Sequence, residues 1–445
     1  MRKMLAVGLF AALPGLFIGI AGAQPFPKDA TFATFALTPL AIEGLTGDAA
    51  GNLYTTGRQA AGKNCPVWRI APDRTRVTAG FIPNNPACNP SGIAFDALGN
   101  LYIADAARGG VIWRVTPDSL GCPSEDPATC SLTPHVSGVP GTNGLAFDRD
   151  GNLWTGDGTT GQGRVWKIKV SDKPANCATA PNDTCVEAFR IQPMANVLPA
   201  MPSNVANVGR DVRTLPPGAI NAARTAAVQQ TIPPCPQGGA PCVLGSQPLV
   251  ANGVAFDHEG DLYIADTARG AIWRAHFHRS GDLKSRIGCD ATFPANTLCL
   301  DNVYVAHPYL EGTDGIALDA AGNIWTSANE RNAVVVVTKQ REVVEIFRNP
   351  ARIEDDSPTQ PRKGLRNSAD RAVGNDHILE FPTSPFLDGR RLCTSNSDGD
   401  RRDNSPRDAG EINAGAASDV PDAFRGKISC MDQELAIPGL PLPVR

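Results

Sequence analysis

The sequence predicts an all-β protein, a six-bladed β-propeller, on three observations. One hairpin phrase recurs along the chain, a further strand follows each copy, and most copies are about 50 residues apart. Repetition at such a spacing is typical of architectures in which each unit buries its apolar faces against its neighbours. The copies are EGLTGDAAGNLY from Glu43, SGIAFDALGNLY from Ser91, NGLAFDRDGNLW from Asn143, NGVAFDHEGDLY from Asn252 and DGIALDAAGNIW from Asp314.

Each copy has the pattern of a β-hairpin with a third strand behind it. Inward and outward residues alternate, and the central Asp-x-x-Gly-Asn is a turn whose glycine can take a positive φ. Three or four short antiparallel strands make one propeller blade, and closing the blades into a ring removes the exposed edges. The predicted third strands are residues 67–70, 111–115, 165–168, 271–274 and 334–337.

The sixth blade has a degraded repeat and is predicted by elimination. Residues 381–386 and 391–394 keep the order of apolar strand, turn and strand, and residues 426–430 can add a third. Residues 31–36, near the N-terminus, can supply the outer strand. We therefore expect both ends of the chain to build one blade.

The six predicted blades form a single domain over residues 24–445. Two segments of this domain do not belong to the predicted blades. The interval between the copies at Asn143 and Asn252 is about twice one blade, so a long insertion, residues 192–249, is expected between blades 3 and 4. Long insertions in repeat proteins are either functional lids or surface excursions, and we favour a lid. Residues 350–376 predict a polar loop, either near the same pore or simply solvated.

The first 23 residues predict a signal peptide. A positive start precedes a mostly apolar stretch, and residues 21–23 (AGA) fit the small-x-small cleavage pattern. An uncleaved membrane anchor is the alternative, and the short, interrupted apolar stretch argues against it. We expect an exported protein, periplasmic or secreted, with no stable membrane insertion after the leader is removed.

Cysteine usage independently favours export. The chain has 12 cysteines, an even number, and they lie mostly in close pairs outside the hairpins. Metal thiolates are the alternative, but no C-x-x-C spacing occurs. Proximity in the sequence predicts these disulfides: Cys65 with Cys88, Cys122 with Cys130, Cys177 with Cys185, Cys235 with Cys242, Cys289 with Cys299, and Cys393 with Cys430.

The charge of the chain argues against nucleic acid as a partner. The formal net charge is −4, and no basic surface suited to nucleic acid is apparent. We expect a monomer that acts on a small molecule.

The residue before each repeated glycine begins an innermost strand and should point toward the shared axis. These positions, which we call the column, are Glu43, Ser91, Asn143, Asn252 and Asp314. Carboxylates and carboxamides are the hard oxygen ligands that Ca²⁺ and similar divalent ions use, and the carboxylates would repel without a cation. The alternative is that these residues only cap strand ends by bonding nearby backbone groups.

The sequence resembles the family of SMP-30, gluconolactonase and related lactonases, which are calcium-dependent six-bladed propellers. The resemblance covers most of residues 40–400 and is strongest over residues 250–348, where ANGVAFD and LYIADT precede GTDGIALD and GNIW. It implies metal ligands at Glu43, Asn252 and Asp314, with Asn143 as a further candidate. It also implies Asp314 as the catalytic base, and substrate contacts from Ser91, Thr142 and Asn143.

The implied activity is opening of a lactone or related ester, with the cation, for which Ca²⁺ is favoured, polarising the carbonyl. Sugar-lactone members carry an Arg and an Asn where this sequence has Pro140, Gly141 and Thr142. Sugar lactones are therefore disfavoured as substrates.

Two other functions are compatible with the repeat phrase, because a fold alone does not assign function. One is a non-catalytic binding propeller of the NHL type, which would need no convergence of ligands on the axis. The other is a propeller enzyme like streptogramin lyase, whose catalytic histidine would be His307 or His377.

Overall fold

A computed structural model of the chain gives the arrangement of its blades. The described residues are 26–27, 30–59, 62–84, 87–122, 126–160, 162–180, 183–191, 250–267, 270–278, 281–284, 296–310, 312–329, 333–348, 378–379, 381–397 and 426–439. The predicted leader, the 192–249 insertion and the 350–376 loop lie outside them.

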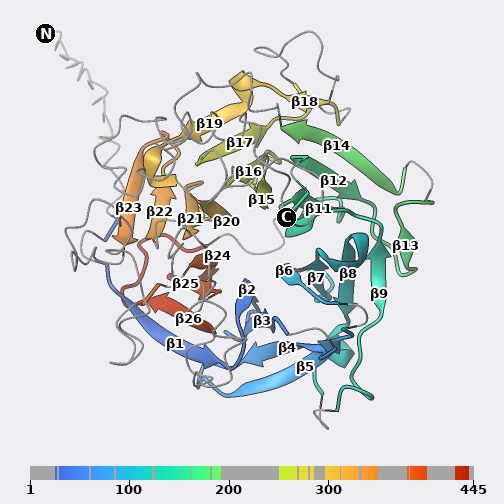
Figure 1. The fold of residues 1–445 in the computed structure, drawn as a ribbon. Helices are drawn as coiled ribbons and strands as arrows, with labels where there is room; N and C mark the ends of the chain where they lie inside the picture. The colour runs from blue at the N-terminus through green and yellow to red at the C-terminus, as the bar shows by residue number, and fades with distance from the viewer. Residues whose placement is uncertain are drawn as a thin grey trace, which may run out of the picture.

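Six sheets surround one axis, which confirms the prediction of a six-bladed β-propeller (Figure 1). Their strands pair antiparallel except for the two-residue edge strands β13 (Ala175–Asn176) and β18 (Thr297–Leu298), which pair parallel. The helical segments that fall wholly within the described residues are short 3-10 turns: Ala107–Gly109, Pro117–Ser119, Leu300–Asn302 and Pro308–Leu310.

The first three blades follow one another along the chain, each running from an inner to an outer strand. Blade 1 consists of β2 (Ile42–Gly47), β3 (Leu53–Gly57), β4 (Cys65–Ile70) and β5 (Arg76–Ile82). Blade 2 consists of β6 (Pro90–Phe95), β7 (Leu101–Asp105), β8 (Val111–Val115) and β9 (Pro134–Ser137), with β13 (Ala175–Asn176) at its edge. Blade 3 consists of β10 (Thr142–Phe147), β11 (Leu153–Asp157), β12 (Arg164–Ile168) and β14 (Cys185–Ile191), with β18 (Thr297–Leu298) at its edge.

The remaining three blades complete the ring. Blade 4 consists of β15 (Ala251–Phe256), β16 (Leu262–Asp266), β17 (Ala271–Ala275) and β19 (Val303–Ala306). Blade 5 consists of β20 (Thr313–Leu318), β21 (Ile324–Ala328), β22 (Ala333–Val337) and β23 (Val343–Arg348). Blade 6 consists of β24 (Pro382–Asp388), β25 (Arg391–Asn396), β26 (Gly426–Met431) and, outermost, β1 (Phe32–Thr38).

The shared hairpin turn explains why the phrase recurs. In blade 1 the Asp48 carboxylate accepts hydrogen bonds from the backbone N–H of Asn52 at 3.0 Å, the Asn52 amide at 2.8 Å and the Tyr54 hydroxyl at 2.9 Å. Gly51 takes a φ of 80°, which a side chain would resist. Burial raises the pKa of Asp48, but these hydrogen bonds outweigh it and leave the pKa below its usual value.

Blade 6 is built from both ends of the chain, as predicted. β1 pairs antiparallel with β26, from Phe32 opposite Met431 to Thr38 opposite Gly426 (Figure 1). A disulfide between Cys393 of β25 and Cys430 of β26 joins two residues that are directly paired in the sheet. The ring is thus closed by hydrogen bonds and by a covalent bond.

Disulfides tie the outer parts of the ring. Cys65 of β4 is bonded to Cys88, which precedes β6, so this bridge links blades 1 and 2. The predicted pairs Cys122 with Cys130, and Cys177 with Cys185, are also formed. Cys299 is disulfide-bonded, whereas Cys289 and the pair Cys235 with Cys242 lie outside the described residues.

These four described disulfides fit an exported protein, because thiols stay reduced in most cytosols. No helix in the described part of the chain is long and apolar enough to cross a membrane.

His135 on β9 gives folding a pH dependence. The residue is only 5% exposed and its ring packs edge-on against Tyr102, with centroids 5.8 Å apart. Burial, aided by the positive charge of Arg114, lowers the pKa of His135 below its usual 6.5. Between that lowered value and 6.5 the unfolded chain binds more protons than the folded one.

We therefore expect stability to be full above about pH 6.5 and to fall as the pH decreases toward the folded pKa of His135, by at most about 1.4 kcal/mol per pH unit for one proton. Urea unfolding between about pH 7 and pH 5 should show a shallower loss for His135→Gln than for the wild type. Equal slopes in the two proteins would contradict the assignment.

Candidate functional site

A β-bulge in every inner strand re-aims the side chains of the column. In blade 5 the register with β21 shifts between Thr313 and Ile316, so the two residues Asp314 and Gly315 lie opposite the single residue Ser327. The inner strands of the other five blades shift at the corresponding position. Bulges bend a strand locally and redirect its side chains, and they are common beside active sites.

The column is buried and has a sixth member. The five predicted residues have exposed fractions between 3% and 8%. Thr383 occupies the corresponding bulge of blade 6 and is 1% exposed. The repeat does not reveal Thr383, because Ser384 and Pro385 replace the usual glycine and aliphatic residue, although the predicted strand order could have indicated the position.

Backbone contacts place the inner strands of blades 4, 5, 6 and 1 in succession around the axis. A Cβ atom added to Gly253 would lie 2.4 Å from the Asp314 carbonyl oxygen, and one added to Gly315 would lie 2.6 Å from the Thr383 carbonyl oxygen. The Thr383 hydroxyl donates to the carbonyl of Glu43 at 2.7 Å. The three predicted ligands, Asn252, Asp314 and Glu43, therefore begin inner strands around one axis, with the strand of Thr383 between the last two.

Glu43 has a positively charged partner that the repeat phrase does not include. The guanidinium of Arg58, which follows β3, forms an ion pair with the Glu43 carboxylate. The Arg58 backbone N–H donates to the Ala41 carbonyl at 2.8 Å, which fixes the residue beside the start of β2. The residue after each second strand thus lies next to a column residue, and that position was the available signal.

The same relation holds in blades 4 and 5. The Asn329 amide, just after β21, donates to Oδ2 of Asp314 at 3.0 Å. The Asn252 amide donates to the Thr267 hydroxyl at 3.1 Å. Asn329 therefore orients the Asp314 carboxylate, and Thr267 orients the Asn252 amide.

The predicted substrate-contacting residues lie on blades 2 and 3. The Ser91 hydroxyl approaches the Thr142 carbonyl at 3.5 Å, and a Cβ on Gly158 would come within 2.3 Å of Nδ2 of Asn143. Thr142 is fully buried, and its hydroxyl is 2.8 Å from that of Thr155. Asn143 and Ser91 retain a small exposed surface, whereas Thr142 supports the strand pairing; substrate contact by all three remains a prediction.

An apolar ring narrows the channel beyond the column. All six inner strands contribute to a cavity of about 110 Å³. Its lining includes, from each strand, the aliphatic or proline residue two positions after the column residue: Leu45, Ile93, Leu145, Val254, Ile316 and Pro385. Polar groups therefore gather at one end of the channel, and apolar groups line its continuation.

The donor set fits a hard cation. Glu43 and Asp314 supply carboxylate oxygens and Asn252 an amide oxygen, which are ligands of Ca²⁺. Asn329 is 3% exposed, and within the described residues its Oδ1 atom is buried and accepts no hydrogen bond. Leaving such an oxygen unpaired costs about 1–3 kcal/mol, a penalty that a nearby bound cation would reduce.

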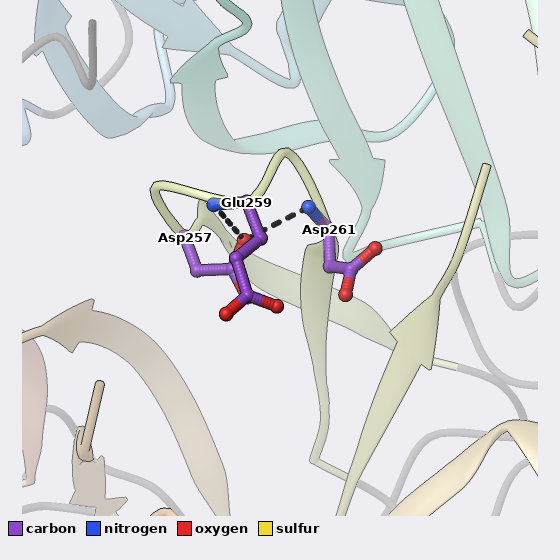
Figure 2. Close-up of side chains that lie close together, drawn as sticks. All are labelled: Asp257, Glu259 and Asp261. Carbon is purple, nitrogen blue, oxygen red and sulfur yellow. Dashed lines mark hydrogen bonds between the residues drawn. The ribbon is translucent and has the colours of Figure 1, made fainter. Parts of the chain in front are cut away.

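A second acidic group lies at the turn after β15, beyond the end of the strand that Asn252 begins. Asp257, Glu259 and Asp261 each offer an oxygen within 4.8 Å of the others (Figure 2). The Asp257 carboxylate is already bonded to the backbone N–H groups of the other two, at 2.9 Å each. Asp261 contacts Arg274 at 2.6 Å and Nδ1 of His276 at 2.8 Å, so its carboxylate already has partners within the protein.

His307, one of the two histidines considered for a lyase-type reaction, lies after an outer strand and not in the column. His307 follows the outer strand β19, and its Nδ1 accepts the backbone N–H of Tyr309 at 3.1 Å. His377 lies outside the described residues.

The fold and the site define a six-bladed β-propeller with oxygen donors gathered at one end of its channel. Residues 238–358, which include Asn252 and Asp314, match the family model for the SMP-30/Gluconolactonase/LRE-like region. The resemblance to SMP-30, gluconolactonase and related proteins is thereby confirmed for this segment. None of the curated proteins matches the chain.

Solved structures of similar proteins include a gluconolactonase from Xanthomonas campestris, with 13% identity, coverage of 93% of this chain and 91% of the other, and a TM-score of 0.45. The calcium-binding protein regucalcin from Agrobacterium tumefaciens has 14% identity, coverage of 92% and 95%, and a TM-score of 0.44. Virginiamycin B lyase from Staphylococcus aureus has 12% identity, coverage of 82% of each chain and a TM-score of 0.38.

Proposed function

We propose that this protein is an exported, cation-dependent hydrolase that opens a lactone or a related ester at the polar end of its central channel. One observation carries the proposal: the Asp314 carboxylate is held by the Asn329 amide within a buried column of oxygen donors. A structural cap would need no such oxygen-rich set around a common axis. The family match over residues 238–358 supports the same class of reaction.

The residues have distinct parts in this reaction. A divalent cation held by Glu43, Asn252 and Asp314, with Ca²⁺ favoured, would polarise the ester carbonyl and offset the developing negative charge. Asp314, oriented by Asn329, would accept a proton from the attacking water. The water oxygen bonds to the carbonyl carbon, the ring C–O bond breaks, and the alkoxide takes up a proton to give a hydroxy acid.

The substrate is expected to differ from a sugar lactone. Gly141 occupies one of the positions where sugar-lactone members carry a larger side chain. Its φ is 80°, and a Cβ there would lie 1.9 Å from Oδ1 of the buried Asp157. Because that position cannot hold an arginine that would bind sugar hydroxyls, we favour less polar lactones and esters.

A hydrolysis panel with calcium added or chelated tests the proposal. We expect at least one lactone or ester to be opened in the presence of Ca²⁺ and the rate to fall by about 100-fold or more after chelation. Readdition of Ca²⁺ should restore the rate, which controls for denaturation. Hydrolysis that is equally fast with chelator present, or a calcium-loaded protein that opens none of the compounds, would overturn the assignment.

A further inference from the structure

Arg58 lies beside the column and contacts two blades. Its guanidinium pairs with Glu43 of blade 1, and its Nε lies 3.5 Å from the Pro90 carbonyl of blade 2, just before Ser91. The Arg58 side chain is 24% exposed, whereas that of Glu43 is 7% exposed. The Arg58 side chain is therefore partly exposed to solvent, whereas the Glu43 carboxylate with which it pairs is buried.

Twelve positions are considered together: the six of the column and the six that directly follow the second strands. Arg58 is the single basic residue among them. The partners that follow the second strands are, in blade order, Arg58, Ala106, Gly158, Thr267, Asn329 and Ser397. The column supplies two carboxylates, from Glu43 and Asp314, so these positions carry a formal charge of about −1 when Arg58 is included. Bringing in a divalent ion with Arg58 still present would leave a net positive charge in a poorly solvated place.

We propose that Arg58 is an internal counterion that competes with the divalent cation for Glu43, so that its guanidinium must leave the carboxylate before the ion binds. The inference rests on the proposed function, because it concerns the same cation site. A buried carboxylate without a partner is costly, which explains why the guanidinium occupies Glu43 when no ion does. Displacement of Arg58 thus opposes ion binding and sets the affinity of the site.

Isothermal titration calorimetry of the full chain with calcium measures this competition directly. The buffer contains no EDTA. We expect Arg58→Gln to lower the Ca²⁺ dissociation constant by about tenfold or more, because a repelling charge and a competing ion pair are both removed. Arg58→Lys keeps the charge and should stay within about threefold of the wild type. Should Arg58→Gln fail to fold, Arg58→Met is the second variant, because it also removes the charge and keeps an unbranched stem.

Arg114→Gln is a matched control. Arg114 on β8 also has one carboxylate neighbour, Asp172 at 3.8 Å, and its side chain is 18% exposed. It is not among the twelve positions, so its replacement should leave the calcium dissociation constant unchanged.

Thermal unfolding provides a second readout that does not depend on activity. Tenfold tighter binding adds about 1.4 kcal/mol of stabilisation at saturating calcium, so calcium should raise the melting temperature more in Arg58→Gln than in the wild type. Without calcium the variant should melt lower, because Glu43 has lost its counterion.

The outcomes separate this inference from the proposed function. If the wild type binds Ca²⁺ and Arg58→Gln binds it equally or more weakly, the counterion role is wrong and the hydrolase assignment stands. If neither protein binds Ca²⁺ at millimolar concentration, both fail. Tighter binding by Arg58→Gln and near-wild-type binding by Arg58→Lys support the competition.

Discussion

Replacement of Asp314 by asparagine is expected to lower the hydrolysis rate by about 100-fold or more and to weaken Ca²⁺ binding, because one change removes both the proposed base and a charged ligand. The substitution preserves the shape of the side chain. In the wild type the Asn329 amide donates to Oδ2 of Asp314 at 3.0 Å, and it can still donate to the amide oxygen of the asparagine. Folding should therefore be retained. Steady-state kinetics on the compound with the fastest turnover, together with calcium calorimetry, measures both losses.

Asp150→Asn is the control for this variant. Asp150 is exposed in the turn between β10 and β11, where its backbone N–H donates to Asp148 at 3.0 Å. The same chemical change there should alter neither the rate nor calcium affinity. If Asp314→Asn kept wild-type turnover while Asp150→Asn did too, Asp314 would have no catalytic part.

Replacement of Gly92 by alanine is expected to destabilise the fold by about 3 kcal/mol or more, because the added methyl group would meet backbone rather than a movable side chain. A Cβ at Gly92 would lie 2.1 Å from the Asn143 carbonyl oxygen and 2.9 Å from the Gly144 Cα. The inner strands of blades 2 and 3 would have to separate. Urea unfolding followed by circular dichroism gives the free energy of unfolding.

Gly121→Ala is the matched substitution for this comparison. A Cβ at Gly121 would have no atom within 4 Å, so its free energy of unfolding should stay within about 1 kcal/mol of the wild type. A Gly92→Ala protein as stable as Gly121→Ala would show that the inner strands are less closely packed than the geometry requires.

The repeat made the blades predictable from sequence. The Asp-x-x-Gly-Asn turn is a local structure, in which Asp48 binds atoms two to six residues away, so its signature survives in a single sequence. The sixth blade was predictable because closure of a ring leaves few segments unassigned. Even the pairing of β1 with β26 followed from that elimination.

The partners of the column were not predictable in the same way. Arg58 and Asn329 reach Glu43 and Asp314 because each follows a second strand whose end lies beside the bulge of the first. A bulge depends on how two strands pair, and the residue after the second strand differs from blade to blade, so the repeat does not identify these partners. Thr383 was missed for a different reason, since Ser384 and Pro385 hide the repeat where blade 6 meets Glu43.

The pairing of β1 with β26 also determines when the ring can close during folding. The backbone N–H of Thr31 donates to the Asp432 carboxylate across 401 positions of sequence, so this contact forms only after Asp432 has been synthesised. Until then β1 lacks the strand with which it pairs, and the unfinished sheet offers a free edge to other chains. Contacts between such distant segments slow folding, so ring closure is the step at which folding and aggregation compete.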